Sequence, residues 1–246
     1  MLKIITLITK FILVVLTALL LASCNHSINL NSIEGSGNVT TERRVVDGDF
    51  KSIEVNNAID LVIEQSDKTE IVVEADDNLQ KHISTTVKNG TLIISCDKNS
   101  FTNMKSKKVT VKMPVIHELE ATSGSTITSN NILKGEHIKL NTSSAASMDI
   151  NIESDNITCD SSSGSSITVN GKALQIKTSA SSGSEIKAEY LLANEVTADV
   201  SSGATINVHP IVSLIAKASS GGNINYDIQP KTIQKNTNSG GSINRE

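Results

Sequence analysis

The stretch SSGGNINYD, residues 219–227, decides the fold because close copies of it recur along the chain. SSGSSITVN occupies residues 162–170, and SSGATINVH occupies residues 201–209. Aligned on the glycine position, the copies share a preceding serine and a large apolar residue three positions later. The turn residues are Ser123-Gly124, Ser144-Ala145, Ser163-Gly164, Ser182-Gly183, Ser202-Gly203, Ser220-Gly221 and Ser239-Gly240; the apolar residues are Ile127, Met148, Ile167, Ile186, Ile206, Ile224 and Ile243. A period of about 19 residues indicates a solenoid.

The segments between these turns alternate apolar and polar residues. Ile138 and Leu140 are separated by one polar residue, as are Ile157 and Cys159. An alternation of period two predicts strands with one buried face. We therefore predict an all-β fold, a parallel β-helix whose coils of about 19 residues stack about 4.8 Å apart.

The serine-glycine phrase is predicted to be structural. Glycine tolerates the positive φ that a tight corner needs. Stacked coils place the serines in a column, where we expect their hydroxyl groups to hydrogen-bond along the axis. A partial amide ladder is expected near a second corner from Asn151, Asn170, Asn207, Asn225 and Asn244.

Residues 34–118 are β-rich but show no obvious period. Asn89-Gly90 stands between two alternating runs, which is a strong signal for a β-hairpin. The stretch ADDNLQKHI predicts a single helical turn capped by Asp76 or Asp77.

The first 24 residues, MLKIITLITKFILVVLTALLLASC, have the features of an export signal. Lysines precede an apolar run that is too short for a comfortable membrane span. The ending Leu21-Ala22-Ser23-Cys24 resembles a bacterial lipobox, which implies cleavage before Cys24 and a lipid on its sulfur. We expect residues 1–23 to be a lipoprotein signal peptide and residues 24–33 a tether. Asn25, directly after the lipidated cysteine, favours sorting of the lipoprotein to the outer membrane. It does not decide between the periplasmic face of that membrane and the cell surface.

The composition excludes some functions. A net charge of −4 and a pI near 5.8 leave no basic surface for nucleic acid. Aromatic residues make up only 2% of the chain, which counts against a tight carbohydrate cleft. Cys96 and Cys159 occupy apolar positions in different regions, so we predict two buried thiols rather than a disulfide.

The sequence shows no catalytic cluster, metal site or cofactor motif. Zinc-binding spacing is absent among the histidines His26, His82, His117, His137 and His209. The acidic pair Asp76-Asp77 is better explained as a helix cap than as a pair of catalytic carboxylates.

Four phrases resemble the family of putative auto-transporter adhesins with a head GIN domain. They are GSGNVTTERRVVDGDFKSIEV (35–55), AIDLVIEQSD, VEADDNLQKHI and LEATSGSTI. The resemblance covers residues 34–246 and implies a right-handed β-helix exported by bacteria, often as a lipoprotein in Bacteroidetes-like organisms. The repeat divides this domain into a β-rich part, 34–118, and seven coils, 119–246. Ala58 stands where this family has glycine.

The leading hypothesis is a lipid-anchored cell-envelope protein that is a non-catalytic adhesion or binding module. Its partner would be a host protein, a glycan or an envelope component. One alternative is a periplasmic structural or envelope-maintenance lipoprotein, and another is a polysaccharide lyase or hydrolase. The open end of the last coil also predicts some homo-oligomerisation, since unpaired strand edges invite pairing.

Overall fold

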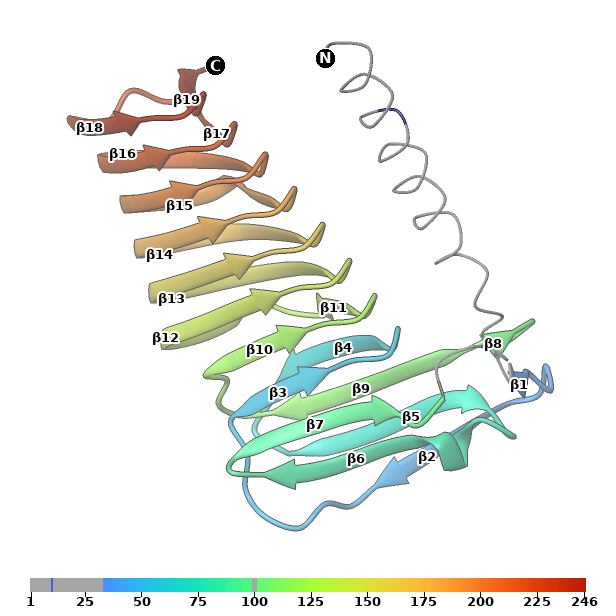
Figure 1. Cartoon of the computed structure of the whole chain (residues 1–246). Helices are drawn as coiled ribbons and strands as arrows, with labels where there is room; N and C mark the ends of the chain where they lie inside the picture. The colour runs from blue at the N-terminus through green and yellow to red at the C-terminus, as the bar shows by residue number, and fades with distance from the viewer. Residues whose placement is uncertain (1–9, 11–32, 99–100) are drawn as a thin grey trace. The chain divides into compact units, whose positions relative to one another are not determined.

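The computed structural model describes residues 33–98 and 101–246, together with Lys10. The predicted signal peptide apart from Lys10, nearly all of the predicted tether and the predicted lipidation site Cys24 lie outside the described residues. The described part of the domain, Ile33–Glu246, is all β except for one turn of 3-10 helix (Figure 1). Among the described residues, none belongs to a helix long and apolar enough to cross a membrane.

A stack of parallel coils forms most of the molecule (Figure 1). Single long strands that bend at their middle run through whole coils: β13 (Ser147–Ser161), β14 (Ser166–Ala180), β15 (Glu185–Val200) and β16 (Thr205–Ala218). The remaining strands of the stack are β10 (Glu118–Ala121), β11 (Thr126–Ser129), β12 (Leu133–Thr142), β17 (Asn223–Tyr226), β18 (Thr232–Thr237) and β19 (Ser242–Arg245). The predicted β-helix is confirmed.

The predicted apolar column fills the interior. Neighbouring coils pair Met148 with Ile167 and Ile167 with Ile186, in register. These side chains are almost fully buried, and only Ile243 in the last coil is half-buried. Each such burial stabilises the fold by roughly 1.5–3 kcal/mol.

The serine-glycine turns are held by the backbone, not by the serine hydroxyls. The serine also has positive φ, for example 56° at Ser163 beside 68° at Gly164, as a type I′ turn requires. The N–H of Gly164 donates to the carbonyl oxygen of Ser182 at 3.1 Å, and the same bond recurs from coil to coil. The hydroxyl ladder predicted for this column was wrong: the serines are exposed, and within residues 101–246 no hydrogen bond joins two of these hydroxyls.

The coils continue into the region that shows no period in sequence. Strands β3 (Ser52–Val55) and β4 (Asp60–Gln65) pair in parallel with β10 and β11. Their turn is Asn57-Ala58, with φ of 60° and 52°, and the Ala58 N–H donates to the Ser123 carbonyl oxygen at 2.9 Å. Ala58 therefore occupies a glycine position of the column.

An antiparallel cap closes the lower end of the stack in Figure 1. β7 and β9 pair in parallel with β3 and β4, while β5 pairs antiparallel with both β2 and β9. The predicted hairpin at Asn89-Gly90 joins β6 to β7. The cap strands are β2 (Val39–Arg44), β5 (Glu70–Asp76), β6 (Ile83–Lys88), β7 (Thr91–Cys96) and β9 (Lys107–Met113), with the small pair β1 (Ile33–Glu34) and β8 (Phe101–Thr102) beside them.

Asp76 does not cap the helical turn η1 (Gln80–His82), and neither does Asp77, so that prediction was wrong. The buried carboxylate of Asp76 instead accepts backbone N–H bonds from Gly37, Lys105 and Ser106, at 2.8 to 3.1 Å. Burial alone would raise the pKa of Asp76, but these donors hold its pKa below the ordinary value. The residue thus ties the start of the domain to the cap.

The asparagine ladder is only partial. The Asn225 amide donates to the Asn207 oxygen at 2.9 Å, whereas Asn244 bonds to Asn223. Asn151 and Asn170 belong to a separate column. Cys96 and Cys159 are free and buried, as predicted.

Candidate functional site

A column of small residues lies at the second corner of the coils, opposite the serine-glycine turns. In-register pairs align Gly135, Ser154, Ala173, Ala193 and Pro210. Each is the centre of a tripeptide whose flanking residues are larger: KGE, ESD, KAL, LAN and HPI. Because the central residues are short, they form the floor of a groove between two walls of longer side chains.

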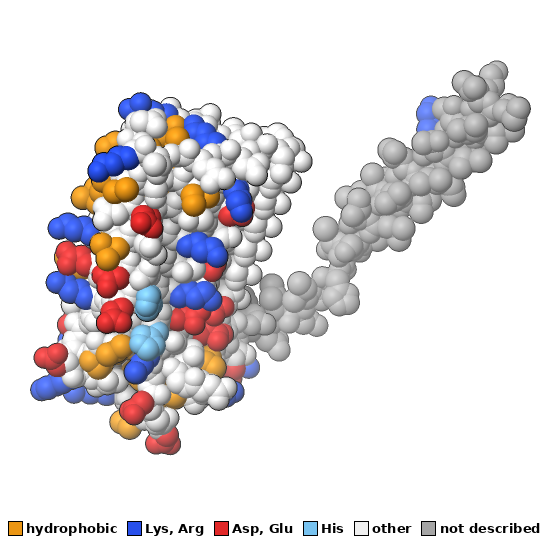
Figure 2. Space-filling view, turned by 90° about the vertical axis from the view of Figure 1, so that its left-hand side faces the viewer, with side chains coloured by type: hydrophobic (Ala, Val, Ile, Leu, Met, Phe, Trp, Pro, Cys, Tyr) orange, Lys and Arg blue, Asp and Glu red, His pale blue; other side chains and the backbone are white. Residues whose placement is uncertain are grey.

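The first wall is continuous across the coils through paired residues. It consists of Lys134, Glu153, Lys172, Leu192 and His209. The second wall follows the small residues along the chain and consists of Glu136, Asp155, Leu174, Asn194 and Ile211. Figure 2 shows charged and hydrophobic side chains gathered together on this side of the molecule.

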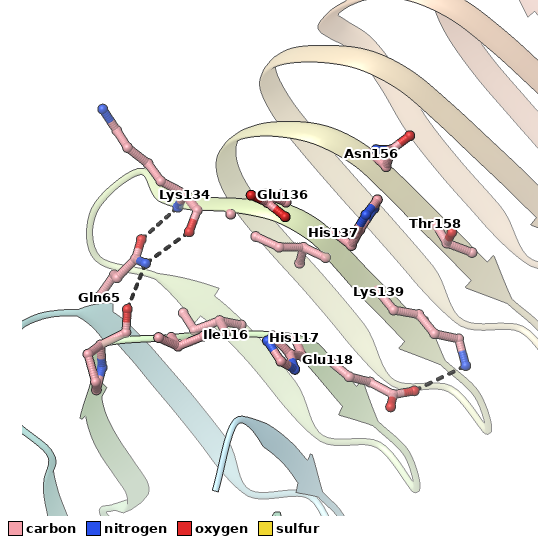
Figure 3. A pocket seen from close by; sticks show the side chains of 14 residues that line it. Gln65, Ile116, His117, Glu118, Lys134, Glu136, His137, Lys139, Asn156 and Thr158 are labelled. Atoms are coloured by element: carbon pink, nitrogen blue, oxygen red, sulfur yellow. Dashed lines mark hydrogen bonds and ion pairs between the residues drawn. The ribbon is translucent and has the colours of Figure 1, made fainter.

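The lower part of the groove is a hollow of about 670 Å³ in which polar and charged side chains adjoin apolar ones such as Ile116 and Ile138. Glu118 pairs with Lys139 at 3.1 Å, and the exposed rings of His117 and His137 come from neighbouring coils (Figure 3). The side-chain amide of Gln65 donates to the carbonyl oxygens of Pro114 and Lys134, both at 2.9 Å. Gln65 thereby fixes the entrance of this hollow.

The upper part is a hollow of about 630 Å³ that shares Lys134 and Gly135 with the lower one. Its apolar lining is unusually exposed: Leu174 is 53% exposed, Leu192 43% and Ile211 37%. The two hollows therefore form one groove, in which charged side chains line both parts and the upper part adds the three exposed apolar side chains.

Reactive groups are sparse in the described structure. Residues 33–98 and 101–246 hold no group of three or more His, Cys, Asp or Glu side chains arranged for a metal ion. Outside the groove, burial and the nearby carboxylates of Glu54 and Glu118 raise the pKa of Glu120. Among the carboxyl groups of the described residues, only that of Glu120 has a raised pKa, which is one property of a general acid.

The sequence did not identify the groove. The predicted serine-glycine ladder lies at the opposite turn and takes no part in it, and Cys24 lies outside the described residues. His117 and His137, noted in sequence as lacking a zinc spacing, line the lower hollow. The recurring tripeptide with a small central residue was the available signal.

A family described as "Putative auto-transporter adhesin, head GIN domain" matches residues 49–230. The chain belongs to this family. Its description names an adhesin, which supports a binding module rather than an enzyme and a place in the cell envelope or at its surface. No curated protein matches the chain.

Solved structures share the fold. A putative adhesin from Bacteroides fragilis NCTC 9343 is 22% identical with a TM-score of 0.80, over 87% of this chain and 100% of that one. A putative adhesin from Parabacteroides merdae ATCC 43184 is 22% identical with a TM-score of 0.70, over 87% and 99%. A putative lipid binding protein from Parabacteroides distasonis ATCC 8503 is 24% identical with a TM-score of 0.72, over 88% and 100%.

Proposed function

We propose that the chain is a lipid-anchored, non-catalytic adhesion module of the bacterial cell envelope that binds its ligand along the second-corner groove. The observation that carries this proposal is the groove itself, in which exposed Leu174, Leu192 and Ile211 adjoin charged side chains. Contiguous exposed apolar surface rimmed by polar groups is typical of interaction sites. The rigid stack of coils holds the groove ready for its ligand.

The lipid anchor is tested separately from the groove. Cells are fed radiolabelled palmitate, and the protein is isolated by immunoprecipitation. The wild-type chain is expected to carry label, and Cys24→Ser is expected to carry none. Label on the Cys24→Ser chain, or none on either chain, would contradict the anchor.

The groove is tested with Leu192→Asp, which places a charge among the exposed apolar side chains of its upper part. Thr197→Asp is the matched control, because Thr197 is exposed on the same strand, β15, but lies outside the groove. Arrays of glycans, extracellular host proteins and envelope components are incubated with each form of residues 34–246. Binding by wild type and control that Leu192→Asp loses supports the groove. Equal binding by all three forms would contradict it.

A second candidate, an enzyme acting on polysaccharides, is favoured by one observation. Glu120 lies beside Glu54 in a hollow of about 300 Å³, with a raised pKa. A carboxyl whose pKa is raised by burial and by neighbouring carboxylates is a candidate general acid. Release of reducing sugar from a polysaccharide panel, abolished by Glu120→Gln, would support this candidate; no release by the wild-type protein would reject it.

A further inference from the structure

We propose that the groove takes an extended peptide segment that carries Lys or Arg close to large apolar side chains. The inference rests on the proposed function and names the ligand class for that same groove. Three properties of the groove lead to it: unpaired carboxylates on its second wall, exposed apolar side chains on the coils above them, and hydrogen-bonding groups beside those apolar side chains.

The unpaired carboxylates belong to Glu136 and Asp155. They occupy equivalent positions on neighbouring coils, since the residues on either side of them are paired in register. Other carboxylates of the groove already have cations: Glu118 pairs with Lys139 at 3.1 Å, and Glu153 with Lys134 at 3.3 Å. Within the described residues, Glu136 and Asp155 have no ion pair. The second wall thus offers negative charge to a ligand cation.

The upper hollow includes Asp155 in its lining, and its exposed apolar side chains begin one coil above Asp155. Leu174 follows Asp155 on the second wall, Leu192 lies one coil higher on the first wall, and Ile211 lies one coil beyond Leu192. Its floor includes Ala173, which is short enough to leave room for an inserted side chain. Burial of one leucine-sized ligand side chain here contributes binding free energy through the hydrophobic effect.

Lys172 and Asn194 supply hydrogen-bond donors that suit a peptide backbone. Both line the upper hollow, and no carboxylate among the described residues pairs with Lys172. The Lys172 ammonium and the Asn194 amide are donors that suit backbone carbonyl oxygens. A lipid acyl chain offers no acceptors to these donors, and a neutral saccharide offers no cation to Glu136 and Asp155.

The coil spacing predicts the arrangement of the peptide. Successive coils lie about 4.8 Å apart, and side chains on one face of an extended strand recur about every 6.8 Å. The apolar side chains lie one to three coils above Asp155, or about 5 to 14 Å away. A basic residue at position i therefore fits with apolar residues at i+2 and i+4.

The test uses fluorescein-labelled octapeptides and residues 34–246, with binding followed by fluorescence anisotropy. One peptide is Gly-Ser-Lys-Thr-Leu-Thr-Leu-Gly; in the others, Glu replaces Lys or Ser replaces both Leu residues. The Lys-Leu-Leu peptide is expected to bind at least tenfold more tightly than either of the others. Glu136→Lys combined with Asp155→Lys is expected to reverse the preference between the Lys and Glu peptides.

Variants in the upper part of the groove complete the test. Leu192→Asp and Leu174→Ser are each expected to weaken binding of the Lys-Leu-Leu peptide at least tenfold. Thr197→Asp is expected to bind this peptide with wild-type affinity. Both leucines are already about half exposed, so the variants should fold, and thermal melting checks this. Equal affinity for the three peptides, or no binding of any, overturns the inference. In that case the groove can still be tested with a glycan or a lipid vesicle. If Leu192→Asp abolishes binding of wild-type protein to one of these, the proposed function stands and only the peptide inference fails.

Discussion

Lys235 lies over the last coil of the described stack, with its Nζ atom 3.4 Å from the carbonyl oxygen of Ile243. The same ammonium lies 4.6 Å from the centre of the Tyr226 ring. Lys235 pairs with Ala216, which faces the interior, and paired residues of parallel strands point the same way. A charge therefore occupies an interior position of the outermost coil, a feature that discourages edge-to-edge pairing of sheets.

Replacing this charge should promote self-association. Lys235→Ile leaves an apolar side chain on the last described coil, and burying it between two copies favours association by roughly 1.5–3 kcal/mol. We expect dimers at a concentration at least about tenfold lower than for wild type in sedimentation velocity. Lys217→Ile is the control, because Lys217 is exposed on β16. Identical behaviour of the two variants would contradict a capping role for Lys235. Homo-oligomerisation of the wild-type chain stays a prediction.

Gly171 is the glycine that tolerates substitution least. A Cβ atom there would lie 2.0 Å from the Ile152 carbonyl oxygen, and φ is +128°. Gly171→Ala is expected to lower the free energy of unfolding by about 3 kcal/mol or more, since the backbone of the neighbouring coil must shift.

Gly164→Ala is the matched comparison for Gly171→Ala. Nothing lies within 4 Å of its added Cβ, and alanine already occupies the equivalent position at Ala145 with φ of 60°. We expect the free energy of unfolding to fall by about 1 kcal/mol, because alanine adopts a left-handed backbone conformation less readily than glycine. Urea unfolding of both variants measures the difference, and similar losses would contradict the steric argument.

Asp76 should make stability depend on pH at the acid end. Its folded pKa is below 3.8, so its contribution is present above that value and is lost as the pH falls through the folded pKa. Asp76→Asn turns an amide N–H₂ group toward a backbone N–H donor. The variant is expected to lower the free energy of unfolding by about 1–3 kcal/mol near pH 7. The difference from wild type should shrink as the pH falls below about 4, because Asp76 of the unfolded chain binds a proton there more readily than Asp76 of the folded chain.

Melting temperatures from pH 3 to 7 test this dependence, with Asp77→Asn as the control. Asp77 is exposed and bonds mainly to Ser36 and Asn38 at the surface, so its replacement should cost less. A constant difference between Asp76→Asn and wild type at every pH would contradict an ionised Asp76 in the fold.

The two buried thiols should be unreactive in the folded protein. Burial raises the pKa of Cys96 and, more strongly, that of Cys159, so both remain protonated at neutral pH. Iodoacetamide attacks the thiolate. Mass spectrometry of residues 34–246 should show no alkylation in buffer and two alkylated cysteines in denaturant without reductant. A missing label in denaturant would indicate a disulfide.

The sequence predicts the coils because each serine-glycine turn is a local feature that repeats. The Asn57-Ala58 turn escapes detection because it has the same backbone conformation with different residues. Stacking of β7 and β9 beneath β3 and β4 depends on pairing between distant segments, which no local pattern reports.

The groove is harder to predict than the coils. Its depth depends on which corner residues align across coils, and the register shifts between Ala188 and Leu192 in β15. Leu192 therefore faces His209 of the next coil, an alignment that counting along a fixed repeat does not give. The open carboxylates Glu136 and Asp155 are likewise recognised only once the ion pairs around them are known.

An adhesion module must meet its ligand outside the cell, so the most direct measurement is the position of the domain relative to the outer membrane. An epitope tag placed after Glu246 is probed with antibody on intact cells and then on permeabilised cells. For an adhesion module, antibody is expected to label intact cells. Treatment of those cells with an external protease is expected to reduce the labelling. Labelling only after permeabilisation would contradict adhesion and direct the search for a partner to the periplasm.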